Sequence, residues 1–172
     1  NIYVTGDTLI AIGCACTAVS NTFAVFYDIS DRTAPREITR FYQSGSEVST
    51  RLTGGRLFII TNHYVDMTET ETQMKETCIP MTGRSESAMA RVPSQNICVM
   101  DNLTSPSYLV VTSLDITSPE TEPASAAVLG GGDNIYCNTE RLYVMSAQYD
   151  YSFMNVFTDY STGTDIAYQA DG

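Results

Sequence analysis

The sequence lacks tryptophan altogether and contains only one histidine, His63, in 172 residues. A single histidine cannot build the zinc sites that use several imidazole ligands, and no His-Glu-x-x-His pattern is present. Lysine and arginine are also scarce, and the formal net charge is −11. Because phosphate binding needs a basic surface, nucleic acid is excluded as a partner. No apolar run reaches the roughly eighteen residues of a membrane-spanning helix, so direct insertion into a membrane is not expected of this segment.

Motifs for nucleophilic catalysis and phosphate binding are missing as well. No Gly-x-Ser-x-Gly nucleophile elbow is present whose serine His63 could activate as a general base. The glycine-rich stretch 130–133 lacks the Lys-Ser/Thr of a phosphate loop. The oxygens of Asp28 and Asp31 suit calcium, but their spacing falls short of a calcium-binding loop. The sequence therefore predicts no catalytic, cofactor-binding or metal-binding residues, and calcium stays an open alternative without a motif to support it.

The five cysteines do not form a complete disulfide framework, because their number is odd. Cys78 and Cys98 lie within the polar segment 66–105, near its two ends, where a disulfide between them would staple that segment. The alternative is that both remain free thiols.

Short segments that alternate between polar and apolar residues make up most of the chain. They are rich in Val, Ile, Phe and Tyr, which favour pleated, half-buried strands, and they are separated by turn residues such as the pair Gly54-Gly55. In the first part of the chain they occupy residues 22–29, 36–43, 48–52 and 57–61. Four such strands in about 43 residues are typical of one blade of a β-propeller.

These segments recur along the chain. Residues 2–13 align without gaps on 135–146 and on 50–61, which brings Leu9, Leu57 and Leu142 to one position. A second repeat ends a strand with Asp28, Asp115 and Asp159, each followed by a large apolar residue and then Ser or Thr. We interpret these aspartates as turn formers, because Asp side chains accept hydrogen bonds from the backbone two residues on.

The repeats predict an all-β fold of propeller-like, four-stranded antiparallel blades, about three blade-equivalents in a single segment over 1–172. The expected divisions are a half-blade at 1–15, a blade at 22–64, an insertion at 66–105, a blade at 108–148 and a half-blade at 152–169. A two-sheet β-sandwich also suits the number of strands, but the repeat argues against it. Both ends fall inside predicted half-blades, so we expect a piece of a longer protein whose export signal or anchor lies upstream.

The insertion and the tyrosines are the candidates for an interaction surface. The insertion carries five of the seven methionines, and Met-rich or exposed aromatic surfaces adapt to partners. Packing between blades is the alternative use for both. The predicted surface residues are His63, Tyr64, Met81, Arg91, Tyr149 and Tyr151.

The ordered set of segments resembles a family of secreted bacterial and archaeal proteins with a C-terminal β-propeller domain distantly related to the Trp-Asp repeat propellers. The resemblance covers the strands of 25–61, the insertion with its Pro80, Pro93 and Cys98, and the strand 107–116. It implies an extracellular or cell-surface location and no established activity. The family propeller is longer than this chain, which implies that the chain is a portion of it.

The expected function is a non-catalytic extracellular module that binds a protein or a cell-surface glycan. The alternatives are a hydrolase-type enzyme with a site at the propeller centre, and a purely architectural domain of a surface protein. Three blade-equivalents are fewer than the four or so of a closed propeller. The two half-blades could pair within one chain, as a strained three-bladed ring, or between two chains. We favour the second outcome and therefore also expect a homo-oligomer.

Overall fold

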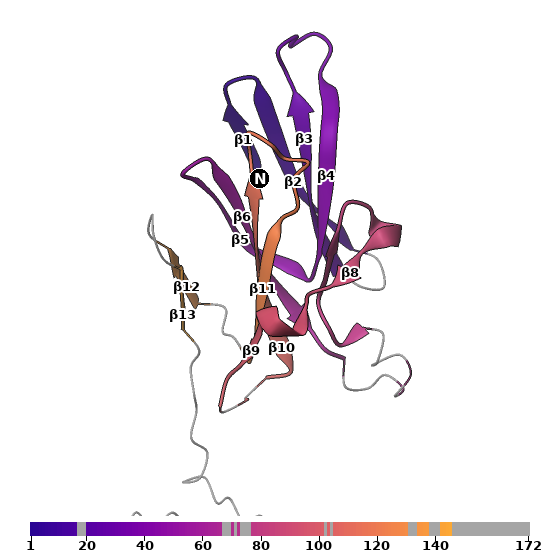
Figure 1. The fold of residues 1–172 in the computed structure, drawn as a ribbon, viewed down its shortest axis with the longest axis vertical. Coiled ribbons are helices and arrows are strands. Elements are labelled where there is room, and N and C mark those ends of the chain that lie inside the picture. The colour runs from indigo at the N-terminus through magenta and orange to yellow at the C-terminus, as the bar shows by residue number, and fades with distance from the viewer. Residues whose placement is uncertain are drawn as a thin grey trace, which may run out of the picture.

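A computed structural model describes residues 1–16, 20–66, 70, 72, 77–101, 103, 105–130, 134–137 and 142–145. Most of these residues lie in β-strands, which confirms the all-β prediction. The strands form two large sheets and a separate hairpin (Figure 1). Within the part of the chain described, no helix is long and apolar enough to cross a membrane.

Sheet A contains the first four strands in chain order, each antiparallel to the next. They are β1 (Ile2–Thr5), β2 (Thr8–Cys16), β3 (Ser20–Asp28) and β4 (Arg36–Ser44). Two short strands of the predicted insertion extend the sheet beyond β4, namely β7 (Met81–Gly83) and β8 (Ala90–Arg91).

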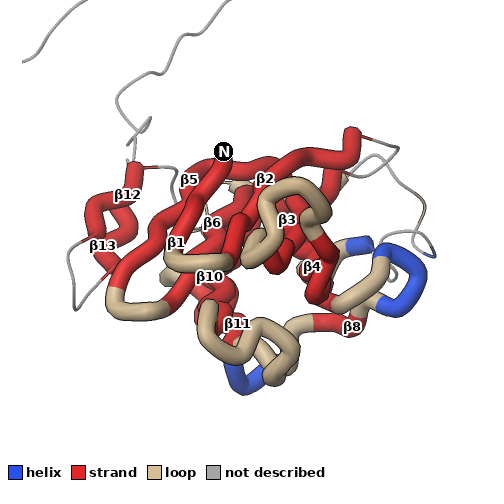
Figure 2. Tube along the Cα trace, turned by 90° about the horizontal axis from the view of Figure 1, so that it is seen from above, coloured by secondary structure: helices blue, strands red, loops and turns tan. Residues whose placement is uncertain are grey.

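Sheet B has the order β5-β6-β10-β11-β9. Its strands are β5 (Ser46–Thr53), β6 (Arg56–Tyr64), β10 (Ser107–Asp115), β11 (Ala124–Leu129) and β9 (Ile97–Val99). Only β9 runs parallel to its neighbour. The hairpin of β12 (Asn134–Cys137) and β13 (Leu142–Met145) lies beside sheet B, on the side away from β3 and β4 (Figures 1 and 2).

The hydrogen bonds between strands combine them into sheets that differ from the blades predicted from the sequence. The four strands assigned to the blade 22–64 are split, with β3 and β4 in sheet A and β5 and β6 in sheet B. The half-blade predicted at 1–15 instead completes sheet A with β3 and β4. In the blade predicted at 108–148, β10 and β11 belong to sheet B, whereas β12 and β13 form their own hairpin. A repeat has the same period whichever strand is counted first, so the alignment alone could not fix the starting strand. The half-blade predicted at 152–169 lies outside the described residues.

The main core lies between the facing sides of the two sheets. Ile10, Phe26 and Phe41 from sheet A meet Leu57, Ile59 and Leu114 from sheet B in one cluster of buried side chains. The residues directly opposite one another across the strands, such as Ile10 and Phe26, share this face. Side chains at alternate positions point away from the core, as the period of two in a strand requires.

The insertion connects the outer edges of the two sheets. Its β7 pairs with β4 and its β9 pairs with β11, and two 3₁₀ turns, η1 (Glu86–Ala88) and η2 (Ser94–Asn96), lie between these strands. Val92 is 2 % exposed and packs with Val110 and Ala127 in a second core cluster. The strand β9 follows η2 directly, and this part of the insertion acts as a brace across both sheets.

The chain passes from sheet A to sheet B through one residue, Gly45. Its φ is +97°, a conformation that L side chains rarely adopt. A Cβ at this position would lie 2.5 Å from the carbonyl oxygen of Asn62 and 2.8 Å from the amide nitrogen of His63. Glycine is therefore required here both by the backbone conformation and by the close approach of β6.

Buried polar side chains surround this corner. The Gln43 side chain is fully buried, and its amide nitrogen donates to Thr61 Oγ1 at 2.8 Å and to the Val110 carbonyl at 3.1 Å. Thr61 Oγ1 in turn donates to the Ser44 carbonyl at 2.7 Å, and Thr22 Oγ1 donates to the Gly45 carbonyl at 2.9 Å. These bonds join four strands around the bend, and those from Thr61 and Thr22 pair the carbonyl groups of the corner residues Ser44 and Gly45.

We predict that Gly45→Ala destabilises the protein by about 3 kcal/mol or more, because backbone strain adds to a clash with β6 backbone. Gly54→Ala is the matched control. Gly54 also has a positive φ, at +56°, but nothing lies within 4 Å of an added Cβ, so only about 1–2 kcal/mol of backbone cost is expected. Urea unfolding followed by circular dichroism measures both, and equal losses for the two variants would refute the steric argument.

A second prediction concerns Gln43, whose amide faces hydrogen-bond acceptors. Gln43→Glu places a carboxylate against the Val110 carbonyl and should cost several kcal/mol, roughly 3 or more. Gln43→Met keeps the shape and removes both the bonds and the buried Oε1, which has no hydrogen-bond partner among the described residues, so a loss of only about 1–2 kcal/mol is expected. The free energies of unfolding in urea test this order, and a Glu variant as stable as the Met variant would contradict the assigned amide contacts.

Candidate functional site

Four turns gather at one end of the two sheets, which we call the loop end: 6–7, 29–35, 54–55 and 116–123. The register of each sheet brings its own two turns together, because Thr8 lies opposite Asp28 and Arg56 lies opposite Asp115. In sheet A the Ile29 amide donates to the Asp7 carbonyl at 2.8 Å. In sheet B the Ile116 amide makes the equivalent bond to the Gly55 carbonyl at 3.1 Å. The corner at Gly45 lies at the opposite end.

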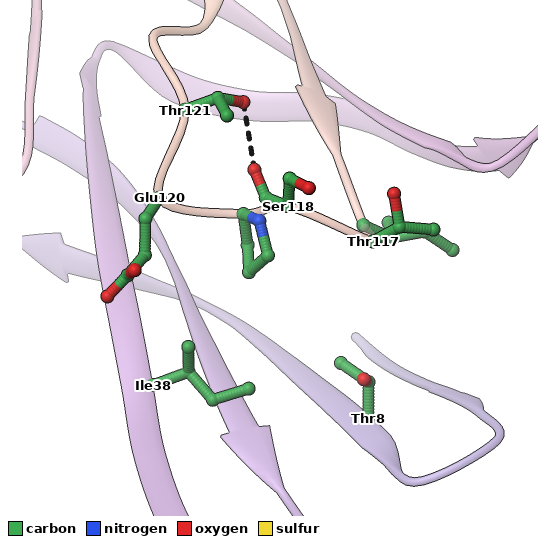
Figure 3. Close-up of a pocket in the computed structure, with 8 residues that line it drawn as sticks. Thr8, Ile38, Thr117, Ser118, Glu120 and Thr121 are labelled. Atoms are coloured by element: carbon green, nitrogen blue, oxygen red, sulfur yellow. Dashed lines mark hydrogen bonds between the residues drawn. The ribbon is translucent and has the colours of Figure 1, made fainter.

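An open cleft of about 530 Å³ separates the two sheets at the loop end (Figure 3). Thr8 and Ile38 line it from sheet A, and residues 116–121 line it from sheet B. Figure 3 shows the Glu120 side chain extending from its loop toward the side of Ile38. Thr121 Oγ1 donates to the Ser118 carbonyl at 2.8 Å, which fixes the loop that carries Glu120. The lining is a mixture of hydroxyl groups, one carboxylate and aliphatic surface.

The repeated aspartates form the turns at this end, as predicted. Asp28 Oδ1 accepts from the Ser30 amide at 2.9 Å, and Asp115 Oδ1 accepts from the Thr117 amide at 2.8 Å and from its hydroxyl at 2.7 Å. These hydrogen bonds to Ser30 and Thr117 lower the pKa of the two carboxyl groups. Both side chains are thus charged and occupied by local turns. Asp159 lies outside the described residues.

A smaller hollow of about 230 Å³ lies nearby, where the insertion meets the loop 116–123. The Arg84 guanidinium stacks over the Phe41 ring at 5.9 Å, and its Nη2 donates to the Thr121 carbonyl. Burial lowers the pKa of Arg84, and the carboxylates of Glu122 and Glu120 oppose that shift. Arg84 therefore ties the insertion to the wall of the main cleft.

His63, a predicted surface residue, is 3 % exposed and faces the interior. Its Nε2 donates to the Thr77 carbonyl at 2.9 Å, and its ring lies 6.1 Å from that of Tyr108. Burial is the main cause of the lowered pKa of His63. The side chain anchors the insertion to β6 and is not available as a contact surface. Its place at the end of a strand, beside a polar segment, did not reveal on which face it lies.

Of the other predicted surface residues, Met81 and Arg91 are cross-strand partners in sheet A, whereas Tyr64 ends β6 in sheet B. Tyr64 is 64 % exposed, Met81 is half-buried in β7, and Arg91 is exposed at the end of β8. Tyr149 and Tyr151 lie outside the described residues. Among the described residues of the predicted set, the structure therefore brings Met81 and Arg91 together and buries His63.

Cys78 and Cys98 are both free thiols, which is the alternative to a disulfide staple that the sequence left open. Cys78 is half-buried near Tyr108, where burial, with a smaller contribution from Cys78, raises the pKa of the Tyr108 hydroxyl. Cys98 is exposed on β9, opposite Val128. The pairing of β9 with β11 holds the segment in place without a disulfide.

The cleft residues Thr8, Ile38, Ser118 and Glu120 are not among those predicted from the sequence. The turn predicted at Asp115 leads into residues 117–121. Nothing in the order of residues shows that this loop faces Thr8 and Ile38 of the other sheet. No group of three or more His, Cys, Asp or Glu that would hold a metal ion occurs in the described ranges.

The pH dependence of the unfolding free energy tests the burial of His63, the single histidine. The folded pKa of His63 lies below the unfolded value of about 6.5, so the unfolded chain binds the proton more readily and stability falls as the pH drops below about 6.5. We predict a lower urea midpoint at about pH 5.5 than at about pH 7.5. In His63→Gln this dependence should flatten. A decrease of the same size in the variant would assign the titration to another group.

Comparison with known families gives one match. A family model described as "Beta propeller domain" matches residues 1–171. No curated protein and no solved structure matches the chain significantly. The match spans both sheets, the insertion and the hairpin. The chain belongs to the β-propeller domain family.

Proposed function

We propose that this chain is a non-catalytic interaction module that works outside the cytoplasm and contacts a protein or a cell-surface glycan through its loop end. The cleft between the sheets carries the proposal, because it is the place where both sheets present polar groups to one space. The resemblance to secreted propeller proteins supports the extracellular location.

Within this proposal, sheets A and B are two consecutive propeller blades, formed by β1–β4 and by β5, β6, β10 and β11. The equivalent bonds from Ile29 to Asp7 and from Ile116 to Gly55 support this equivalence, since the sequence repeat aligns Asp7 with Gly55. The packing of one sheet face on the next also suits consecutive blades. The cleft then lies between two blades, where loops of propellers are free to vary.

The chemistry of the cleft favours a partner with a positively charged group. Glu120 lines the cleft, and Asp115 and Glu122 flank the same loop. The formal net charge of −11 adds a long-range field that attracts cations. An amino sugar or a lysine side chain both supply a cationic nitrogen, and the hydroxyl groups of Thr8 and Ser118 suit the neighbouring polar groups of either partner.

Titration with chitosan oligosaccharides, with a lysine-containing peptide and with a neutral N-acetylated oligosaccharide tests this function. Binding of a cationic probe should weaken with added salt, and Glu120→Gln should weaken it by roughly three- to tenfold. Asp101→Asn is the matched control. It removes one charge from an exposed residue next to Met100, whose amide donates to the Leu129 carbonyl at the far end of β11.

Isothermal titration calorimetry gives the affinities, and chromatography of the same mixtures detects cleavage. Equal weakening by Glu120→Gln and Asp101→Asn would remove the cleft as the contact site. Release of shortened oligosaccharides would contradict a non-catalytic module.

A further inference from the structure

We propose that the hollow of about 230 Å³ between the insertion and the loop 116–123 binds the acetamido group of a 2-acetamido sugar, such as N-acetylglucosamine. The hollow shares no lining residue with the cleft that carries the proposed function, and the acetamido group is neutral whereas the cleft favours a cation. Either inference can therefore fail without the other. The proposal rests on an unpaired donor, an acceptor on the facing segment and the apolar surface between them.

Arg84 supplies a hydrogen-bond donor that the protein leaves unpaired. Its guanidinium lies over the Phe41 ring at 5.9 Å, and its Nη2 donates to the Thr121 carbonyl. Its Nη1 is buried and has no hydrogen-bond partner within the described part of the chain. An unpaired buried donor on a charged group is costly, so an acceptor oxygen that a ligand brings is favoured here. Because two contacts already hold the guanidinium, little conformational freedom is lost when that oxygen binds.

Glu122 supplies a hydrogen-bond acceptor to the same hollow. Arg84 lines the hollow from the insertion and Glu122 lines it from the loop 116–123, yet no ion pair joins these two described residues. The hollow therefore has a donor on one segment and an acceptor on the other. A secondary amide is a neutral group that matches both, because its carbonyl oxygen accepts and its N–H donates.

The lining between these two polar groups is largely apolar. Phe41 is 1 % exposed, and Ala88, Ala90 and Pro123 border the same space. The two alanines leave room that a larger side chain would fill. The methyl group of an acetamide can pack on this surface while its amide meets the two polar side chains, and burial of that methyl group adds a favourable contribution to binding.

Size, charge and neighbouring hydroxyl groups select the ligand. The hollow is smaller than the roughly 300–1,000 Å³ of pockets for drug-sized ligands, so it suits a single sugar residue or its substituent. A carboxylate ligand would be repelled by Glu120 and Glu122, which both act on Arg84, and by the net charge of −11. The hydroxyl groups of Thr82 and Ser85 suit the ring hydroxyls of a sugar, which an acetylated lysine side chain lacks.

Saturation-transfer NMR with the monosaccharide N-acetylglucosamine tests the site, with glucose, glucosamine and Nε-acetyl-lysine as comparison probes. The acetyl methyl group should receive the strongest saturation, because it packs on the apolar lining. Glucose and glucosamine lack the acetyl group and should bind at least about tenfold more weakly. Because N-acetylglucosamine is neutral, its affinity should not change with salt, unlike the affinity of the cationic probes for the cleft.

Three variants locate the binding in the hollow. Ala90→Leu fills the hollow from an exposed position of β8 and should weaken binding by at least about tenfold. Ala126→Leu is the matched control, because Ala126 is also an exposed strand alanine but lies on β11 and does not line the hollow. Arg84→Met keeps an unbranched side chain beside Phe41 and removes the donor, so it should weaken binding to a similar degree. Circular dichroism checks that each variant is folded.

Several results would overturn the proposal. N-acetylglucosamine that binds no better than glucose would remove the acetamido group as the ligand. Equal affinities of Ala90→Leu and Ala126→Leu would place the contact outside the hollow, and unchanged binding by Arg84→Met would remove the unpaired donor from the argument. Nε-acetyl-lysine that binds as tightly as the sugar would overturn the choice of a sugar.

Discussion

The bend at Gly45 is the constraint on which the rest of this structure depends. A single residue carries the chain from the last strand of the first four to the first strand of sheet B, and β6 passes so close that no side chain fits there. This fixes how the two sheets face each other, and with it which side chains enter the main core. The cleft at the loop end follows from the same bend, because sheets joined at one end are free to diverge at the other.

The bend is held by buried polar groups in addition to apolar packing. Gln43, Thr61 and Thr22 supply hydrogen bonds to carbonyl groups around the corner. Such bonds contribute modestly to net stability, but an unpaired carbonyl in this place would be costly. Apolar residues alone would let the sheets slide on one another, whereas directed hydrogen bonds select one arrangement. The insertion adds a second constraint at the outer edge, where Val92 packs against sheet B and β7 extends sheet A.

Family membership and site chemistry are separate questions in this protein. The propeller family accounts for the repeat and the face-to-face packing, whereas a function must be argued from the groups that the loops present. Those groups are mainly hydroxyls and carboxylates. The aspartates of the turns accept hydrogen bonds from their own loops, so Glu120 is the carboxylate that faces the cleft.

The sequence by itself determined the all-β class, most strand positions, the repeat and the role of Asp28 and Asp115 in turns. These features depend on local chemistry: the period of two, the positive φ of glycine and the reach of an aspartate to the next turn. Only the tertiary structure decided which strands share a sheet. It also decided that His63 is buried and that Thr8 and Ile38 face Glu120. Period-two patterns show that a strand has two faces but not what covers each one. That depends on packing between residues far apart in the chain, and no local pattern records it.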